Sequence, residues 1–430
     1  MQEIRNGFAV LRLWSRALAG LVAAVCAAMP VSAGAVDGFH LRGFGSLGYT
    51  HEHTDDVAFL RDVTQPVPPD RDGTWRSDSI LGVQAGYRFS PQWEFATQLV
   101  ARHREGSSLE DAVEWAYLAW RPTDAFDLRV GRVGKDVFLL SDHRSLGYAQ
   151  TWVRPPREFY GWIPLYSIDG ADLAWRFDAG QTRFTFKTQL GRSSTPFPLT
   201  EDEHFDFGAD RIRNLSVLAE RGPWQLKAAL SVFEVDGDPH LDPARAALGG
   251  LAAGGFGPIS DEAARLGRDL HLDGTTVRYH SLGAAYDDGR WVLQGELARV
   301  DADSHLVASG TTGYLSVARR IGAFTPYVSL ARFHPSRDAR KAANDWAALG
   351  ADADLLQRRV LAAYNTFRID QRTLTLGVRW DFADQAALKL QWDRSHVKGH
   401  GYGLWQVDNV VGGNEGRRID VLSISMDFVF

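Results

Sequence analysis

The chain has 430 residues and a formal net charge of −6, from 47 lysines and arginines against 53 aspartates and glutamates. This mild acidity argues against nucleic acid as a partner. The single cysteine excludes a disulfide framework within the chain.

The N-terminal residues 1–35 have the layout of a secretory signal peptide. Three arginines precede an apolar run at 17–29, and small residues follow it. We expect cleavage after Ala35, with Ala33 as the alternative. The apolar run is shorter than the ~20 residues of a membrane-spanning helix, which disfavours an uncleaved anchor. Cleavage would remove Cys26 and change the net charge to −8, since three arginines and one glutamate are lost.

Aromatic residues are plentiful in a chain that is polar on average. The sequence has 23 Phe, 14 Trp and 12 Tyr, yet its mean hydropathy is −0.23. A transmembrane β-barrel produces this combination, because only alternate strand residues face lipid and aromatic residues gather at the membrane interfaces. A soluble β-sandwich or barrel rarely needs so many aromatic residues along its whole length.

Alternating apolar and polar residues predict strands throughout residues 36–430. A half-buried soluble sheet alternates in the same way, so the number of strands is what discriminates. Sixteen candidate strands are expected at 38–50, 77–90, 93–105, 111–121, 125–133, 166–177, 182–191, 210–220, 224–235, 274–286, 291–301, 311–320, 324–333, 371–382, 386–397 and 417–430.

The connections between these strands alternate in length. Short ones, rich in the Gly, Pro and Asp that turns require, lie at 90–92, 122–124, 178–181, 221–223, 287–290, 321–323 and 383–385. Longer ones lie at 51–76, 134–165, 192–209, 236–273, 334–370 and 398–416. This alternation places all tight turns at one end of the barrel. Outer-membrane barrels have short periplasmic turns and long extracellular loops.

Many aromatic residues lie beside the tight turns, among them Trp93, Trp120, Trp175, Trp224 and Trp380. In a membrane barrel they would form the periplasmic interfacial belt. The alternative, a set of core aromatics in a soluble all-β protein, should be spread along the strands instead.

The chain ends in an alternating segment from Arg418 to Phe430. This ending resembles the C-terminal targeting strand of bacterial outer-membrane proteins, which the barrel-assembly machinery recognises. Phe428 and Phe430 are therefore the candidate assembly signal.

Together these features resemble a Gram-negative porin. The segment 113–120 followed by 126–132 is similar to a strand pair of general and phosphate-selective porins, in which the second strand leads into the loop that narrows the pore. In architecture the resemblance extends over the whole mature chain, whereas specific motifs resemble porins only in these two segments. It implies a homotrimer and carries no substrate assignment.

The connection 134–165 follows that strand pair and is the candidate constriction loop. It contains apolar side chains, such as Phe138 and Trp152, that a loop floating in water would not need. Inside a barrel these could pack on the wall while charges line the hole, where rings of Arg and Lys select anions. The candidate constriction residues are Lys135, Asp142, Arg144, Arg154, Arg157 and Tyr160. The alternative is a surface loop whose charges pair with one another.

Strand positions of lumen-facing parity carry more basic than acidic side chains, which predicts a basic wall in an acidic chain. The candidate wall residues are Arg88, Arg102, Arg129, Arg176, Lys187 and Arg379. The acidity gathers in loops such as 201–203, where solvation and divalent bridging to lipopolysaccharide are sufficient explanations.

No enzyme motif accompanies the barrel pattern. A nucleophilic serine needs a histidine and an orienting group, and His280 and His396 fall at lipid-facing parity without a GxSxG, HExxH or metal-ligand cluster. The glycine-rich stretch 248–257 is interpreted as loop, and 339–364 as a loop containing a short helix. We expect no catalytic residue, metal or cofactor.

The sequence therefore predicts an all-β protein in which residues 36–430 form one transmembrane antiparallel barrel of about 16 strands in the Gram-negative outer membrane. The expected function is a porin for passive diffusion of small hydrophilic solutes, with a preference for anionic or carboxylated ones. The alternatives are a barrel hydrolase and a plugged structural or adhesive barrel. Expected partners are the lipid bilayer, lipopolysaccharide, the barrel-assembly machinery and, in a homotrimer, further copies of the chain.

Overall fold

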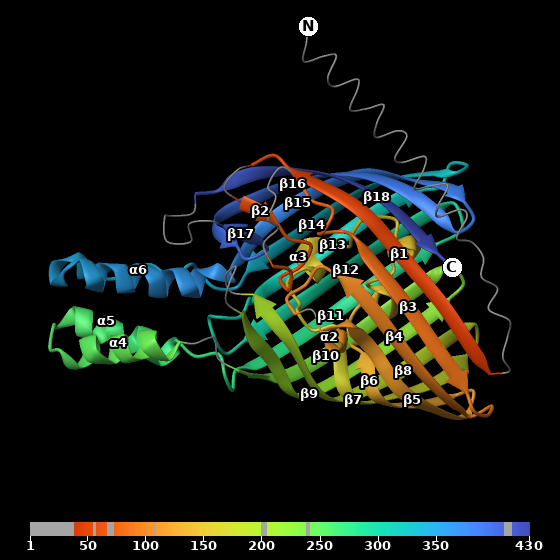
Figure 1. Cartoon of the computed structure of the whole chain (residues 1–430), viewed down its shortest axis with the longest axis horizontal. Helices are drawn as coiled ribbons and strands as arrows, with labels where there is room; N and C mark the ends of the chain where they lie inside the picture. The colour runs from red at the N-terminus through yellow and green to blue at the C-terminus, as the bar shows by residue number, and fades with distance from the viewer. Residues whose placement is uncertain are drawn as a thin grey trace, which may run out of the picture.

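The described strands form a closed antiparallel β-barrel in which they run obliquely to the long axis (Figure 1). This computed structural model describes residues 38–54, 57–66, 73–106, 108–198, 204–237, 241–407 and 415–430. The predicted signal peptide at 1–35 and the acidic residues at 201–203 lie outside the described residues.

Sixteen strands in the described part of the chain close the barrel, each beside its neighbour in sequence, and β1 closes it by pairing with both β3 and β18. They are β1 (Phe39–Glu52), β3 (Ile80–Arg88), β4 (Trp93–Arg102), β5 (Val113–Thr123), β6 (Phe126–Gly134), β7 (Ser167–Ala179), β8 (Thr182–Pro198), β9 (His204–Arg221), β10 (Trp224–Asp236), β11 (Thr276–Asp287), β12 (Trp291–Ala302), β13 (Gly310–Arg319), β14 (Phe324–Pro335), β15 (Ile369–Ala383), β16 (Ala386–Tyr402) and β18 (Arg417–Val429). The predicted fold class and strand number are confirmed.

The tight turns all lie at one end, which we call the tight-turn end, and the longer connections lie at the other, the long-loop end. The prediction of a loop over 192–209 is wrong for most of that range, because β8 and β9 continue to Pro198 and from His204. Phe197 and Phe205 pair across this extension with ring centroids 5.5 Å apart. A register shift between Gly191 and Ser193 breaks the alternation there, which hid the continuing strand.

The outer face of the barrel carries an apolar band, as membrane-spanning strands require. On β10, Leu226 and Leu230 are 51% and 48% exposed, whereas Ala229 and Ser231 between and beyond them are buried. Aromatic pairs lie on this face next to the tight turns, for example Trp224 and Tyr286 with ring centroids 4.7 Å apart. The apolar girdle and the closed ladder together identify a transmembrane barrel, since closure leaves no unpaired strand edge in lipid.

The last strand completes the barrel wall against the first. Phe430 exchanges two backbone hydrogen bonds with Gly43, at 2.8 and 2.9 Å. The rings of Phe428 and Phe430 stack on the outer face and cover Gly45 and Gly43, where a side chain would collide with them. The candidate assembly residues therefore lie on the seam, and their role in targeting stays a prediction.

Helices project beyond the strands at the long-loop end (Figure 1). They are α4 (Asp242–Ala253), α5 (Pro258–Asp269) and α6 (Ala351–Thr366). The shorter α2 (Leu109–Ala112) lies between β4 and β5, and the 3-10 turn η3 (Trp346–Leu349) precedes α6 in the same connection. The helix predicted within 339–364 is present. The interpretation of 248–257 as loop is wrong up to Ala253, because its glycines are flanked by helix-forming Ala and Leu. No helix in the described ranges is long and apolar enough to span a membrane.

Candidate functional site

Residues 135–166, between β6 and β7, fold into the barrel, and we call this segment the inner loop. Its short elements are the 3-10 turns η1 (Ser141–His143) and η2 (Gly147–Ala149) and the helical turn α3 (Arg157–Tyr160). Phe138, Trp152 and Phe159 are only 2%, 3% and 0% exposed. Burial of each such side chain contributes about 1.5–3 kcal/mol, which favours the inward position over a solvated loop.

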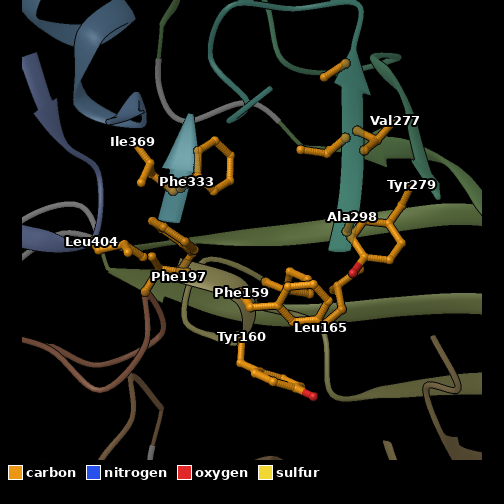
Figure 2. Packing of buried hydrophobic residues seen from close by; sticks show 14 of the residues in the cluster. Phe159, Tyr160, Leu165, Phe197, Val277, Tyr279, Ala298, Phe333, Ile369 and Leu404 are labelled. Atoms are coloured by element: carbon orange, nitrogen blue, oxygen red, sulfur yellow. The ribbon is translucent and has the colours of Figure 1, made fainter. Parts of the chain in front are cut away.

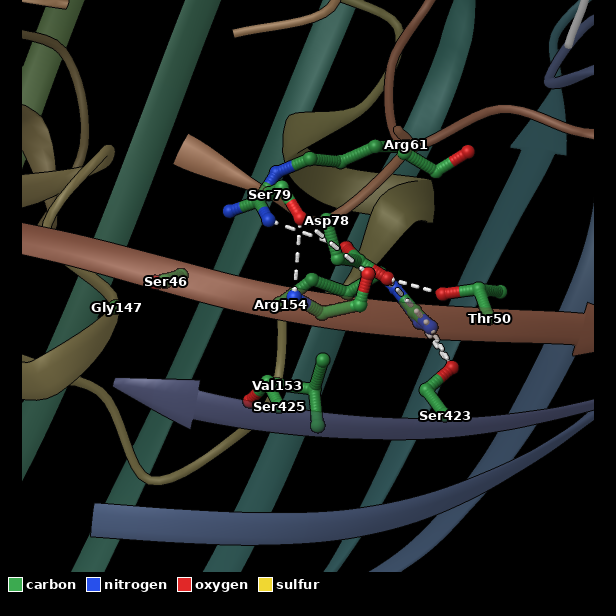
Figure 3. Close-up of polar contacts among 12 residues, drawn as sticks. Ser46, Thr50, Arg61, Asp78, Ser79, Gly147, Val153, Arg154, Ser423 and Ser425 are labelled. Carbon is green, nitrogen blue, oxygen red and sulfur yellow. Dashed lines mark hydrogen bonds and ion pairs between the residues drawn. The ribbon is translucent and has the colours of Figure 1, made fainter. Parts of the chain in front are cut away.

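Arg154 attaches the inner loop to the wall beside β1 and β18 (Figure 3). Its guanidinium lies 3.3 Å from Asp78 and 3.5 Å from Asp393, and it donates a hydrogen bond to Ser423 at 3.1 Å. Asp78 also accepts a hydrogen bond from Arg61 at 3.1 Å. Because the Arg154 side chain is 2% exposed, water screens these contacts little.

Arg157 lies between two aromatic rings instead of beside a carboxylate. Its guanidinium is 4.4 Å from the ring centroid of Phe59 and 4.3 Å from that of Trp405. These rings belong to a small two-stranded sheet, β2 (Val57–Phe59) and β17 (Trp405–Val407). Burial lowers the pKa of Arg157 to about 10, so the side chain stays charged at neutral pH.

On the opposite wall, Asp136 is the main ionic contact of the inner loop. Its carboxylate lies 2.5 Å from Lys227 and 3.6 Å from Lys187, and it accepts a hydrogen bond from Ser216 at 2.6 Å. Burial would raise the pKa of Asp136, but these two ammonium groups hold it well below its usual range.

Glu296 of β12 holds the middle of the inner loop. It accepts hydrogen bonds from the backbone N–H of Leu139 at 2.9 Å, from the hydroxyl of Tyr314 at 2.8 Å, and from the hydroxyl of Tyr160. The predicted constriction residue Tyr160 is thus buried against the wall, with its ring 5.2 Å from that of Phe138.

Nearer the tight-turn end, Lys389 of β16 holds the inner loop against the barrel wall. Its ammonium lies 2.9 Å from Asp427 and donates to the carbonyls of Gly147 at 2.8 Å and Trp152 at 2.7 Å. The side chains of Lys389 and Asp427 are both fully buried. A buried ion pair of this kind costs desolvation, but loss of one partner leaves an uncompensated charge, so it holds the loop in one geometry.

The predicted wall residues all face inward or lie at the rim, and each has an acidic partner. The pairs are Arg88 with Glu94 at 3.8 Å, Arg102 with Glu114 at 3.8 Å, Arg129 with Asp172 at 2.9 Å, Arg176 with Asp127 at 3.5 Å, Lys187 with Asp136 at 3.6 Å and Arg379 with Asp381 at 2.7 Å. Because of these pairs, the wall carries less free positive charge than a count of its basic residues suggests.

Two main cavities flank the inner loop. The larger, about 500 Å³, lies toward the tight-turn end, and its lining includes Arg42, Glu114, Lys135, Asp142 and Arg144. The smaller, about 80 Å³, lies at the long-loop end and is lined almost wholly by apolar side chains. Lys135 and Leu165 line both cavities.

Three of the predicted constriction residues, Lys135, Asp142 and Arg144, therefore border the larger cavity. Arg154 and Arg157 instead line a small space of about 20 Å³ against the wall. Arg144 lies 3.9 Å above the ring of Tyr166, and no carboxylate comes within 4.0 Å of it in the described part of the chain.

The apolar packing at the long-loop end was not anticipated from the sequence. Figure 2 shows loop residues Phe159, Tyr160 and Leu165 between wall residues such as Phe197 and Tyr279. The lumen-facing parity of Phe233 and Tyr279 was readable in the sequence, whereas that of Phe197 and Phe205 was hidden by the loop expected at 192–209. Their meeting was not readable, because they come from strands far apart in the chain. Asp78 and Asp427 were missed as anchors for the same reason.

Solved structures with a similar backbone are outer-membrane porins and channels. OmpF of Salmonella typhi, in a complex with daunomycin, aligns with a TM-score of 0.52 at 11% identity over 91% of this chain and 97% of that chain. An anion-selective porin from Comamonas acidovorans aligns with a TM-score of 0.51 at 12% identity over 91% and 99%. The chain has the porin fold. The outer-membrane channel DcaP of Acinetobacter baumannii shares this fold, with a TM-score of 0.50 at 10% identity over 92% and 99%.

No family model and no curated protein matches the sequence. At these low identities the similarity supports the fold alone, so the chemistry of the site has to be inferred from its side chains. Within the described residues, no group of three or more His, Cys, Asp and Glu side chains is arranged to hold a metal ion.

Proposed function

We propose that this protein is an outer-membrane pore for passive diffusion of small hydrophilic solutes, with a preference for anions. The observation that carries the proposal is the inner loop inside the lumen, with a cavity on each side and Lys135 and Leu165 common to both. A solute that passes between the cavities would pass these two residues. The tight turns would face the periplasm and the long loops the outside.

The charge around the larger cavity supports the anion preference. Its lining has three cationic side chains, Arg42, Lys135 and Arg144, against the two carboxylates of Glu114 and Asp142. Basic side chains at a constriction act on every permeating ion. In this proposal Arg154 and Arg157 contribute mainly by holding the inner loop in place.

A plugged barrel is the second candidate, and the dense burial of the inner loop favours it. Single-channel recording in planar bilayers separates the two. Open ohmic steps support the pore, and a folded protein that inserts without conducting supports the plugged barrel. Nothing in the site favours a hydrolase.

The selectivity proposal has its own test in a salt gradient. Replacing Arg144→Met should shift the reversal potential toward cation selectivity, because the lining loses a charge that has no carboxylate within 4.0 Å among the described residues. Arg88→Met is the matched control, since Arg88 is 60% exposed at the rim. Charges there are screened within about 8 Å at physiological salt. Equal shifts for both variants would contradict the proposal.

A homotrimer also remains a proposal, which the mass of the purified protein in detergent would test.

A further inference from the structure

The cavity at the long-loop end has an unusual lining for a pore that carries hydrophilic solutes. Its described lining consists of aromatic and aliphatic residues, including Phe197, Phe233, Val277 and Leu306, and its only charged side chain is that of Lys135. A wholly apolar pocket would exclude ions, and a polar one would hold water. This one combines an apolar enclosure with a single cation.

Lys135 has no acidic partner in the described part of the chain. Its side chain is 5% exposed, no carboxylate lies within 4.0 Å of its ammonium, and the ring centroid of Phe233 is 5.0 Å away. The other buried lysines of the lumen are compensated, because Lys187 and Lys227 face Asp136 and Lys389 faces Asp427. A buried charge without a counterion is costly, so an anion that reaches Lys135 would be bound strongly.

Tyr279 also lines this cavity. The hydroxyl of Tyr279 is buried and makes no hydrogen bond within the described residues. Because this hydroxyl is enclosed by protein, a ligand in the cavity would contact the ring of Tyr279. Lys135 therefore supplies the charge in this cavity, and the ring of Tyr279 adds to its aromatic lining.

We propose that this cavity binds a monoanion with an apolar body, such as a single aromatic ring that carries one carboxylate. The carboxylate would lie at Lys135, and the ring would pack against Phe197, Phe233 and Val277. A volume of about 80 Å³ corresponds to about six water positions, which suits one ring and not two. A dicarboxylate is disfavoured, because its second charge would face apolar side chains.

This inference deepens the proposed pore function and rests on it for the exit of the solute, since Lys135 and Leu165 also border the larger cavity. Binding in the apolar cavity would select the solute, and release past Lys135 would deliver it to the polar side.

The test uses the full-length folded protein in detergent micelles and three probes, each followed by ¹⁹F NMR. 4-Fluorobenzoate has both the ring and the charge, 4-fluorobenzamide has the ring alone, and trifluoroacetate has the charge alone. The benzoate should bind at least about tenfold more tightly than either of the others, a difference of about 1.4 kcal/mol. Equal affinity for the benzoate and the benzamide would overturn the proposal.

Variants locate the site. Lys135→Met should reduce the affinity for the benzoate to that for the benzamide, and Lys135→Arg should retain most of it. Lys398→Met is the control, because Lys398 is 56% exposed outside the cavity. Unchanged benzoate binding by a folded Lys135→Met protein would refute the assignment. Should that variant not fold, the three probes on the unmodified protein still decide the role of charge.

The same protein in planar bilayers separates this inference from the pore proposal. Binding without conductance would refute the pore and leave the site. Conductance without binding would refute the site and leave the pore.

Discussion

The two ends of the lumen hold the same loop with different chemistry. Along β8 to β12, lumen-facing residues nearer the tight-turn end are polar and contact the inner loop directly or through neighbours; they include Lys187, Ser216, Lys227 and Glu296. Further along the same strands, the lumen-facing residues are apolar and form a cluster; they include Phe197, Phe205, Phe233, Val277 and Val300. The change occurs within single strands, as between Glu296 and Val300 on β12.

The two ends therefore have different roles: the polar end positions the inner loop, and the apolar end lines the smaller cavity. Ion pairs and hydrogen bonds are directional and have few acceptable geometries, so the polar end determines where the inner loop lies. Apolar packing is less directional, so the apolar end contributes less to the position of the loop, and the cavity beside Lys135 lies there. Removing a polar anchor should therefore displace the loop, whereas removing an apolar side chain should mainly enlarge the cavity.

The largest effect is expected from Lys389→Met. Asp427 would stay buried without its cation, and the carbonyls of Gly147 and Trp152 would lose their donor. We expect a loss of about 4 kcal/mol in the free energy of unfolding, measured by denaturant titration with the folded fraction read on a cold gel. Lys398→Met, at an exposed pair, should cost no more than about 1 kcal/mol. Similar losses for both would show that the Lys389 pair is not an anchor.

A smaller loss is expected from Phe233→Ala at the apolar end. The side chain is 8% exposed, and its removal should lower the free energy of unfolding by about 3 kcal/mol. The inner loop should keep its place because its polar anchors remain, so anion selectivity should persist. Phe89→Ala is the control, since Phe89 is 61% exposed on the outer face. A loss of selectivity in Phe233→Ala would show that the apolar end also positions the inner loop.

Two serines allow the same substitution in the polar and in the apolar part of the lumen. Ser216 donates to Asp136 at 2.6 Å, whereas the buried hydroxyl of Ser231 has no partner among the described residues. Ser216→Ala should cost about 1.5–3 kcal/mol, as for a hydrogen bond to a charged group. Ser231→Ala should be neutral or slightly stabilising, because it removes an unsatisfied group. Denaturant titration of both variants checks this contrast. A larger loss in the free energy of unfolding for Ser231→Ala than for Ser216→Ala would contradict it.

The smallest expected effect concerns pH and Lys135, which lies in the inner loop outside the spanning strands. Burial, and then the nearby Arg144, lower the pKa of Lys135 to about 7. Its charge is therefore present below pH 7 and is lost as the pH rises, so 4-fluorobenzoate should bind about tenfold more weakly at pH 8 than at pH 6. The affinity of 4-fluorobenzamide should not change over this range.

Other groups that face Lys135 do not reverse this expectation. The ionisable side chains that line the two cavities beside it are Arg42, Glu114, Asp142, His143, Arg144, Tyr166 and Tyr279. Burial lowers the pKa of His143, which keeps it mostly neutral at and above pH 7. A benzoate affinity that stays constant from pH 6 to pH 8 would show that the charge of Lys135 does not control binding.

The sequence by itself determined the barrel. Strand number, tight turns and the inward or outward direction of most side chains follow from local patterns, because strand alternation and turn chemistry depend on neighbouring residues. The inward position of the inner loop was also foreseeable, since Phe138 and Trp152 would be costly in water. Where the pattern was interrupted, as at Gly191 and Ser193, the continuation of the predicted strand was missed.

Only the tertiary structure decided what the charges do. Arg154 was foreseen as a residue of the hole, but Asp78 and Asp393, far from it in sequence, bury it against the wall. Conversely, the apolar cavity around Lys135 exists because β8 to β12 bring their aromatic and aliphatic residues together at one end. The partners of a buried charge and the size of a cavity depend on contacts between distant segments, which closure of the barrel sets and a local pattern does not contain.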